Sequence, residues 1–104
     1  MRQTGWRREV VKIADRLLEE VFGVRMKKSL LYNMSRIGVG LEDVVNDPEK
    51  FVWGLERVFG RTLARLLERR LASEIAEGLG LGPGEHDLES VIKKLEKSSR
   101  AGER

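Results

Sequence analysis

The chain has 104 residues, of which 36% are charged, with both signs mixed and a net charge of only +3. This length favours a single domain, which folds unaided because it buries roughly two-thirds of the surface that the unfolded chain exposes. The lack of cysteine excludes disulfides, thiol catalysis and thiolate metal sites. The small excess of bases gives only weak support for nucleic-acid binding.

The composition also bears on location and source. The first twenty residues are rich in charge and lack the apolar core of a signal peptide. No apolar run approaches the roughly twenty residues that a membrane helix needs. We therefore expect a cytoplasmic protein without a membrane segment. Abundant Arg, Glu and Leu are compatible with a thermophilic source.

Apolar residues recur with helical spacing throughout, and no segment alternates over enough residues to predict a strand. A first helix is predicted over residues 5–22, and a glycine at position 23 ends it because glycine accepts the left-handed conformation. A second helix follows over residues 24–37, closed by glycines at 38 and 40. The expected apolar faces are Val10, Ala14, Leu17, Leu18 and Val21, with Trp6 and Ile13 at the edge, and then Met26, Leu30, Met34 and Ile37, with Leu31 on the flank.

The clearest helix start is Asp47-Pro48-Glu49. Asp caps free backbone N–H groups, Pro fits the first helical position, and Glu favours the positive end of the helix dipole. The third helix is predicted over residues 48–59, after a short turn that places Leu41, Val44 and Val45 in the core. Gly60 separates it, by a sharp bend or a kink, from a fourth helix over residues 61–78. The apolar faces are Phe51, Val52, Leu55, Val58 and Phe59, and then Leu63, Leu67, Leu71 and Ile75, with Leu66 on another side.

Residues 79–84 form a run of helix breakers. A last helix is predicted over residues 88–98, with Asp87 as its cap and Leu88, Val91, Ile92 and Leu95 on one face. Residues 1–98 are thus expected to form one all-α domain, a compact bundle of about five short helices, followed by a flexible tail over residues 99–104. We find no internal repeat and no low-complexity tract.

The residue types needed for catalysis do not gather in any motif. His86 is the only histidine, and its neighbours Glu85 and Asp87 rarely converge with it on one ion, so a solvated residue beside a helix cap is favoured over a metal ligand. The glycines between positions 78 and 84 lack the preceding strand and following Lys-Ser/Thr pair of a phosphate-binding loop. We therefore expect no enzyme and no catalytic, cofactor-binding or metal-binding residue.

Two basic stripes are the main reason to consider nucleic acid. Residues 25–36 carry four bases and no acid. At about 100° per residue, one face of this helix combines bases, which neutralise phosphates, with a tyrosine, which stacks or donates a hydrogen bond. The alternative is that both stripes are solvated helix faces, partnered by Glu68 and the acidic third helix. The candidate contacts are Arg25, Lys28, Tyr32 and Arg36 on the second helix and Arg61, Arg65 and Arg69 on the fourth.

A second candidate surface is built on Trp53 and the fourth helix. Trp53 projects away from the apolar face of its own helix, so it either anchors an interface or lies between two neighbouring elements. The fourth helix is apolar on more than one side, and its Arg70 and Glu74 can pair with each other or across a two-fold axis. This surplus predicts a homodimer. The candidate partner or dimer contacts are Trp53, Leu63, Leu66, Leu67, Arg70, Leu71 and Glu74.

A family resemblance lies within residues 23–81. It rests on the order Tyr32, Asp47-Pro48-Glu49-Lys50-Phe51, Leu55, Val58-Phe59-Gly60, Leu67-Glu68 and Leu79-Gly80-Leu81. This order resembles a group of small archaeal helical proteins without an assigned biochemical activity, which also occurs as an output domain of signal-transduction proteins. Thr62 stands where that pattern has a second glycine. The resemblance implies an all-helical fold, a regulatory role without catalysis, and no ligand residues.

Two functions follow as hypotheses. The first is a homodimeric protein-interaction or regulatory module, acting as a signalling or transcription adaptor. The second is a nucleic-acid-binding protein that uses the two basic stripes. They differ in whether the seven candidate nucleic-acid contacts share one uninterrupted face, and in whether binding to nucleic acid falls steeply with salt.

Overall fold

The computed structural model describes residues 2–82 and 87–102. These residues form five helices and no strand, so the predicted all-α class is confirmed. The molecule measures 42 × 27 × 21 Å along its principal axes. Its helices are α1 (Arg2–Arg36), α2 (Asp43–Asn46), α3 (Pro48–Phe59), α4 (Arg61–Gly78) and α5 (Leu88–Gly102).

Helix α1 is bent at Gly23, whose φ of 85° and ψ of 166° are not helical. The bend divides α1 into a first arm, residues 2–22, and a second arm, residues 24–36. These arms correspond to the two helices predicted from the sequence. Glycine is required because this backbone conformation is essentially closed to residues with a Cβ.

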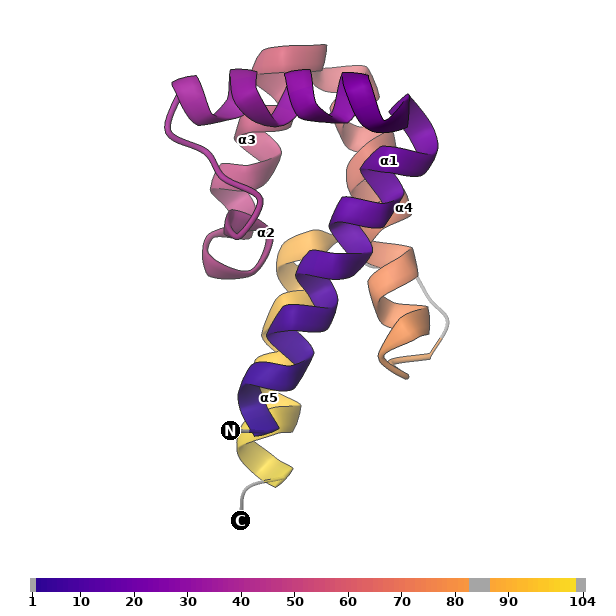
Figure 1. Ribbon diagram of the computed structural model, residues 1–104. Coiled ribbons are helices and arrows are strands. Elements are labelled where there is room, and N and C mark those ends of the chain that lie inside the picture. The colour runs from indigo at the N-terminus through magenta and orange to yellow at the C-terminus, as the bar shows by residue number, and fades with distance from the viewer. Residues whose placement is uncertain (1, 83–86, 103–104) are drawn as a thin grey trace.

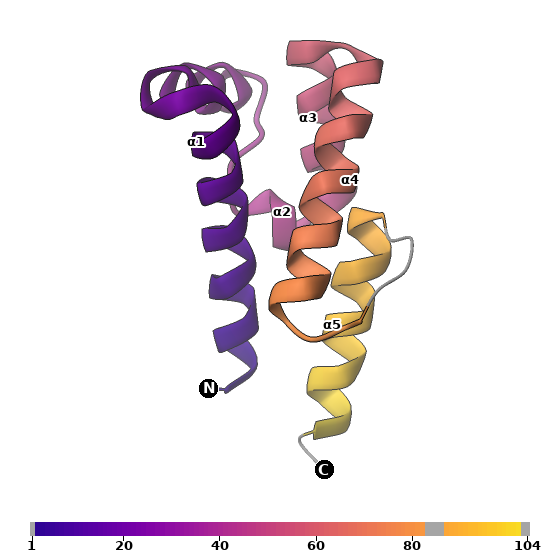
Figure 2. The ribbon, with the colours of Figure 1, turned by 90° about the vertical axis from the view of Figure 1, so that its right-hand side faces the viewer.

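The bend between α3 and α4 lies beside the bend of α1. Figures 1 and 2 both place the two bends at one end of the molecule, and the start of α1 and the end of α5 at the other. The first arm of α1 and α4 run along the length of the molecule, whereas the second arm crosses its end (Figure 1). Gly60 makes a sharp bend, since α3 and α4 return alongside each other (Figure 2). Thr62 is already helical, so this bend needs a single glycine.

Two aspartates fix the starts of α3 and α5 as predicted. The Asp47 carboxylate accepts a hydrogen bond from the Lys50 backbone N–H at 3.2 Å, and Pro48 opens α3. Asp87 accepts from the Ser90 backbone N–H at 2.7 Å. These contacts satisfy N–H groups that have no partner within their own helix.

The core lies where all five helices meet, and no described polar or charged residue is buried in it. Helix α2 contributes Val44 and Val45, as the sequence predicted for this turn. The predicted face of α5 is buried in full. The largest fully buried side chains are Val10, Leu17, Met34, Val39, Val44, Phe51, Leu55, Ile75, Leu88 and Val91.

Three residues assigned to apolar faces lie on the surface instead. Val21 is 44% exposed, Met26 54% and Leu63 37%. Val21 and Met26 flank the α1 bend, where the chain turns away from the core that the rest of each arm contacts. Leu63 lies at the edge of the buried face of α4. Three alanines belong to that face, so the middle of the face is displaced from the line of leucines that includes Leu63. The three alanines are Ala64, Ala72 and Ala76.

The two bends form an internal repeat that the sequence analysis did not identify. The segment Leu18-Glu19-Glu20-Val21-Phe22-Gly23 reappears 37 residues later as Leu55-Glu56-Arg57-Val58-Phe59-Gly60. Gly23 and Gly60 share a φ of 85°, with ψ of 166° and 167°. Equivalent positions beyond the glycines have similar burial: Leu30 and Leu67 are 2% and 6% exposed, and Met34 and Leu71 0% and 3%. Each repeat is a helix, a Phe-Gly bend and a second helix.

The end of the last helix differs from its prediction. Helix α5 continues to Gly102 rather than ending at residue 98, and residues 103 and 104 lie outside the described residues. The predicted break after α4 is present, since Gly80 and Gly82 have positive φ of 74° and 85°. None of the helices in the described ranges has the length and apolar character needed to cross a membrane.

Candidate functional site

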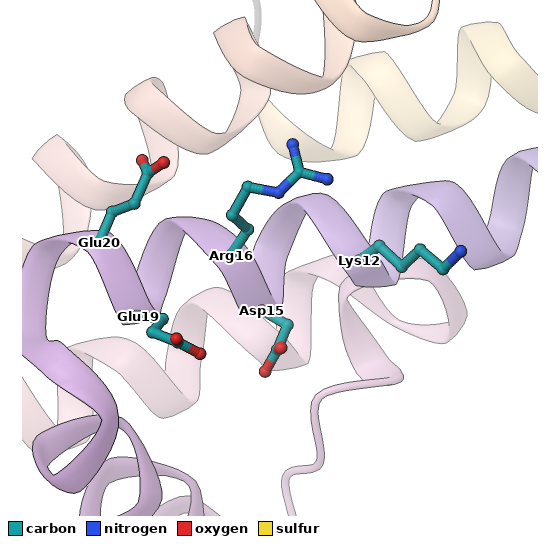
Figure 3. A pocket seen from close by; sticks show the side chains of 5 residues that line it. All are labelled: Lys12, Asp15, Arg16, Glu19 and Glu20. Atoms are coloured by element: carbon teal, nitrogen blue, oxygen red, sulfur yellow. The ribbon is translucent and has the colours of Figure 1, made fainter.

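Five charged side chains line an open depression on the first arm of α1: Lys12, Asp15, Arg16, Glu19 and Glu20. Figure 3 shows that Arg16 and Glu20 point to one side of the helix and Asp15 and Glu19 to the other. The groups therefore do not converge on a common point where a substrate atom or an ion would be held. The depression is a charged helix surface.

Two of the three carboxylates on that surface, Asp15 and Glu19, form salt bridges with Lys27. Its ammonium group lies 2.9 Å from Asp15 Oδ1 and 2.9 Å from Glu19 Oε1, although Lys27 belongs to the second arm and both carboxylates to the first. The hydrogen bonds with Glu19 and then Asp15 raise the pKa of Lys27 above its ordinary value of 10.5. Only 12% of the Lys27 side chain is exposed. These two salt bridges connect the first and second arms of α1 across the bend at Gly23.

No described group of three or more His, Asp or Glu residues is arranged to hold a metal ion. His86 and Glu85 lie outside the described residues, and their neighbour Asp87 caps α5. Glu68, which one of the two interpretations made a partner of the basic stripes, accepts a hydrogen bond from the Leu88 backbone N–H at 3.2 Å. It fixes the start of α5 against α4.

All seven candidate nucleic-acid contacts are exposed. Within the described residues, none of the six bases among them forms a salt bridge. The two stripes begin at the same end of the molecule and then diverge, because the second arm of α1 crosses that end while α4 runs along the length (Figures 1 and 2). Arg25 and Arg61 thus start near neighbouring bends, whereas Arg36 and Arg69 lie on separate elements that lead apart.

Trp53 lies on the surface of α3 with 45% of the residue exposed. The Arg57 guanidinium lies over its ring, 5.7 Å from the centroid. Trp53 is therefore not a core residue between two covered faces. It contributes to an open groove between α3, α4 and α5, whose other lining residues are Pro48, Glu49, Val52, Glu56, Glu68, Asp87 and Glu89.

The other candidate interface residues divide between core and surface. Leu67 and Leu71 are buried within the chain, at 6% and 3% exposure, so they cannot contact a partner unless the core opens. Leu66 is 60% exposed. Arg70 and Glu74 pair with each other within the chain, with 3.0 Å between Nε and Oε2, which is one of the two pairings predicted from the sequence.

A further apolar surface surrounds the two bends. We call it the bend patch and define it as Val21, Val24, Met26, Leu63 and Leu66, which are between 37% and 60% exposed. The half-buried rings of Phe22 and Phe59 join the two bends, stacked with centroids 5.0 Å apart. Leu63 and Leu66 were among the partner contacts predicted from the sequence, whereas Val21 and Met26 were predicted only as members of apolar helix faces and Val24 was not a candidate. The repeated Leu-Glu-x-Val-Phe-Gly segment is the feature of the sequence from which the similarity of the two bends could have been predicted.

The described residues thus form an all-helical domain that exposes several large apolar side chains. The family model described as Nitrosopumilus output domain 5 matches residues 7–97. This match covers most of the chain, which therefore belongs to that archaeal output-domain family. It is wider than the resemblance over residues 23–81 and includes both bends. Neither the curated proteins nor the solved structures contain a match.

Proposed function

We propose that this output domain is a non-enzymatic regulatory module that acts through protein contacts and forms a homodimer. The observation that carries the proposal is the exposed Trp53 in an open groove of α3, α4 and α5. Tryptophan is enriched among the residues that dominate interface energies, because it buries a large area with little loss of conformational freedom. The description of the family as an output domain supports a regulatory role.

The charges around Trp53 suit a contact between two copies of the chain. In a two-fold dimer the same surface faces itself, so residue i meets residue j and residue j meets residue i. The groove lining holds five carboxylates (Glu49, Glu56, Glu68, Asp87 and Glu89), and Arg57, whose guanidinium lies over the Trp53 ring, supplies the opposite charge. Arg57 of one copy can thus face a glutamate of the other while the two tryptophans fill the centre.

Light scattering at micromolar concentrations tests the homodimer directly. We expect the mass of a dimer for the natural chain and a shift toward the monomer for Trp53→Ser. Tyr32→Ser is the matched control, because Tyr32 is 62% exposed but belongs to the second arm of α1. A monomeric natural chain would contradict the homodimer. A dimer that persists in Trp53→Ser would show that the interface lies elsewhere on the surface.

Nucleic-acid binding is the second candidate function, supported by exposed bases that lack salt bridges within the described residues. A gel-shift titration at several salt concentrations tests it. Phosphate contacts predict affinity that falls steeply with salt, and a loss of binding in the double variant Arg25→Glu with Arg36→Glu. Arg16→Glu is the control, since Arg16 is exposed on the first arm, outside both stripes. Absence of a shift at low salt would exclude this function for the duplexes tested.

A further inference from the structure

The charged residues around the bend patch are mostly basic, whereas those lining the Trp53 groove are acidic. Residues 20–28 and 57–69, which contain the two bends, hold seven Arg and Lys residues and only two Glu residues. Of these bases, Lys27 alone forms a salt bridge with a described residue. Of the acids, Glu68 is engaged with the Leu88 backbone N–H. Exposed apolar side chains and unpaired bases therefore occupy the same end of the molecule.

The five apolar side chains all lie within six residues of one of the two bend glycines. Val21, Val24 and Met26 are within three residues of Gly23, and Leu66, the most distant member, is six residues beyond Gly60. Six residues of helix correspond to about 9 Å. The stacked Phe22 and Phe59 hold the two bends together, so the patch spans both repeats.

Charge decides which occupant fits. A second copy of the chain, related by a two-fold axis, would bring like-charged basic borders together, which is unfavourable. Nucleic acid would pair with the bases but would leave Val24, Met26, Leu63 and Leu66 without apolar partners. A helix with an apolar stripe and acidic flanks satisfies both the exposed apolar groups and the bases.

We propose that the bend patch is a docking site for an acidic amphipathic helix of another protein. The inference rests on the proposed role in protein contacts and adds to it a second surface and the chemistry of its partner. Leucine side chains of the partner pack on Met26, Leu63 and Leu66 around the bends. Its carboxylates face Arg25, Arg61 and Arg65, which makes the association faster and dependent on salt.

The test uses a labelled helical peptide of about 18 residues, with leucines on one stripe and glutamates elsewhere, titrated with the full chain by fluorescence anisotropy. One control peptide keeps the leucines and replaces glutamate by lysine, and another keeps the glutamates and replaces leucine by serine. We expect both controls to bind about tenfold more weakly or worse. Equal binding of all three peptides would overturn the proposal.

Surface variants locate the binding site without disturbing the core. Met26→Ser with Leu66→Ser, and separately Arg61→Glu with Arg65→Glu, are each expected to weaken acidic-peptide binding about tenfold or more. Trp53→Ser is the control and is expected to bind the peptide as the natural chain does. Circular dichroism confirms that each variant is folded. Unchanged affinity in both double variants would overturn the assignment to the bend patch.

Methionine methyl resonances give an independent readout. The Met26 methyl group is expected to shift when peptide is added, whereas that of Met34, which is 0% exposed, stays in place. Light scattering separates this inference from the proposed homodimer. If the bend-patch variants abolish dimerisation and no peptide binds, the occupant is a second copy and this inference fails while the homodimer stands. The inference also fails if no peptide binds while DNA does, and DNA binding is lost in Arg61→Glu with Arg65→Glu but not in Met26→Ser with Leu66→Ser.

Discussion

Phe22 and Phe59 lie in parallel, with ring centroids 5.0 Å apart and an angle of 6° between their planes. Each phenylalanine directly precedes a glycine, and the two glycines share a φ of 85°. The two aromatic rings are therefore equivalent residues of an internal repeat that meet each other. This contact links the α1 bend to the α3–α4 bend and fixes the end of the molecule that carries the bend patch.

The first prediction concerns the backbone at the bends. Gly23→Ala and Gly60→Ala are each expected to lower the free energy of unfolding by about 1–3 kcal/mol, because their φ and ψ values are essentially restricted to glycine. The loss is conformational, since an added Cβ at either position meets no atom within 4 Å. Urea unfolding measures the change.

Gly5→Ala is the matched control for these variants. Gly5 is exposed in the first arm of α1, without positive φ and with open space around an added Cβ. Alanine is favoured over glycine in a helix by up to about 1 kcal/mol, so this variant is expected to keep or raise stability. Losses of equal size at positions 5, 23 and 60 would contradict the argument from the bends.

The second prediction concerns the stacked rings. Phe22→Leu and Phe59→Leu each remove the aromatic pair while keeping an apolar side chain. A double-mutant cycle is expected to give a coupling of about 0.5–1.5 kcal/mol, the range for an aromatic pair beyond its buried area. Additive losses, measured by urea unfolding, would mean that the two bends are not energetically linked through this contact.

Much of the fold could be predicted because the signals that define it are local. The Asp47 cap and Pro48 define the start of α3, and single glycines at positions 23 and 60 define the two bends. Each of these signals lies at the structural feature that it determines. Four residues at spacings of one helical turn identified the buried face of α5. Signals of this kind do not depend on where other helices lie.

The bend patch was predicted only in part: Leu63 and Leu66 were candidate partner contacts, but Val21, Val24 and Met26 were not. Periodicity gives the orientation of an apolar residue on its helix, but not whether a neighbouring element reaches that part of the helix. Met26 and Leu63 have the spacing of core residues, yet they lie beyond the core at the bends. The alanines of α4, which carry a weaker apolar signal than its leucines, decide which side of that helix is buried. The repeated segment was visible in the sequence, but only the Phe22–Phe59 contact gives it a structural meaning.

The third prediction concerns close packing at Gly54, which is buried in α3. A Cβ at this position would lie 2.9 Å from Met34 Cε and 3.1 Å from both γ-carbons of Val39. The gain in helix propensity from Gly54→Ala, up to about 1 kcal/mol, is outweighed by overpacking of about 1–3 kcal/mol. We therefore expect a net loss of stability in thermal and urea unfolding.

A second variant separates overpacking from any other effect at this position. Val39→Ala removes the two γ-carbons and is destabilising alone, because Val39 is 1% exposed. In the double variant Gly54→Ala with Val39→Ala, the new Cβ occupies part of the vacated space. The combined loss is therefore expected to be smaller than the sum of the single losses, by about 0.5 kcal/mol or more. A combined loss equal to that sum would rule out the steric explanation.

The last prediction concerns the two salt bridges that connect the arms of α1 across its bend. Hydrogen bonds with Glu19 and Asp15 raise the pKa of Lys27 above 10.5, so the folded protein favours the charged ammonium more than the unfolded chain does. This contribution to stability is complete below the unfolded pKa and is lost as the pH rises through the higher folded pKa. The difference in free energy of unfolding between the natural chain and Lys27→Met is thus expected to be constant from neutral pH to about pH 10 and to shrink above it. Lys28→Met is the matched control, since Lys28 is exposed on the same arm and forms no salt bridge with a described residue. Urea unfolding at a series of alkaline pH values measures both differences, and a Lys27→Met difference that does not change with pH would show that the ammonium does not hold the bend closed.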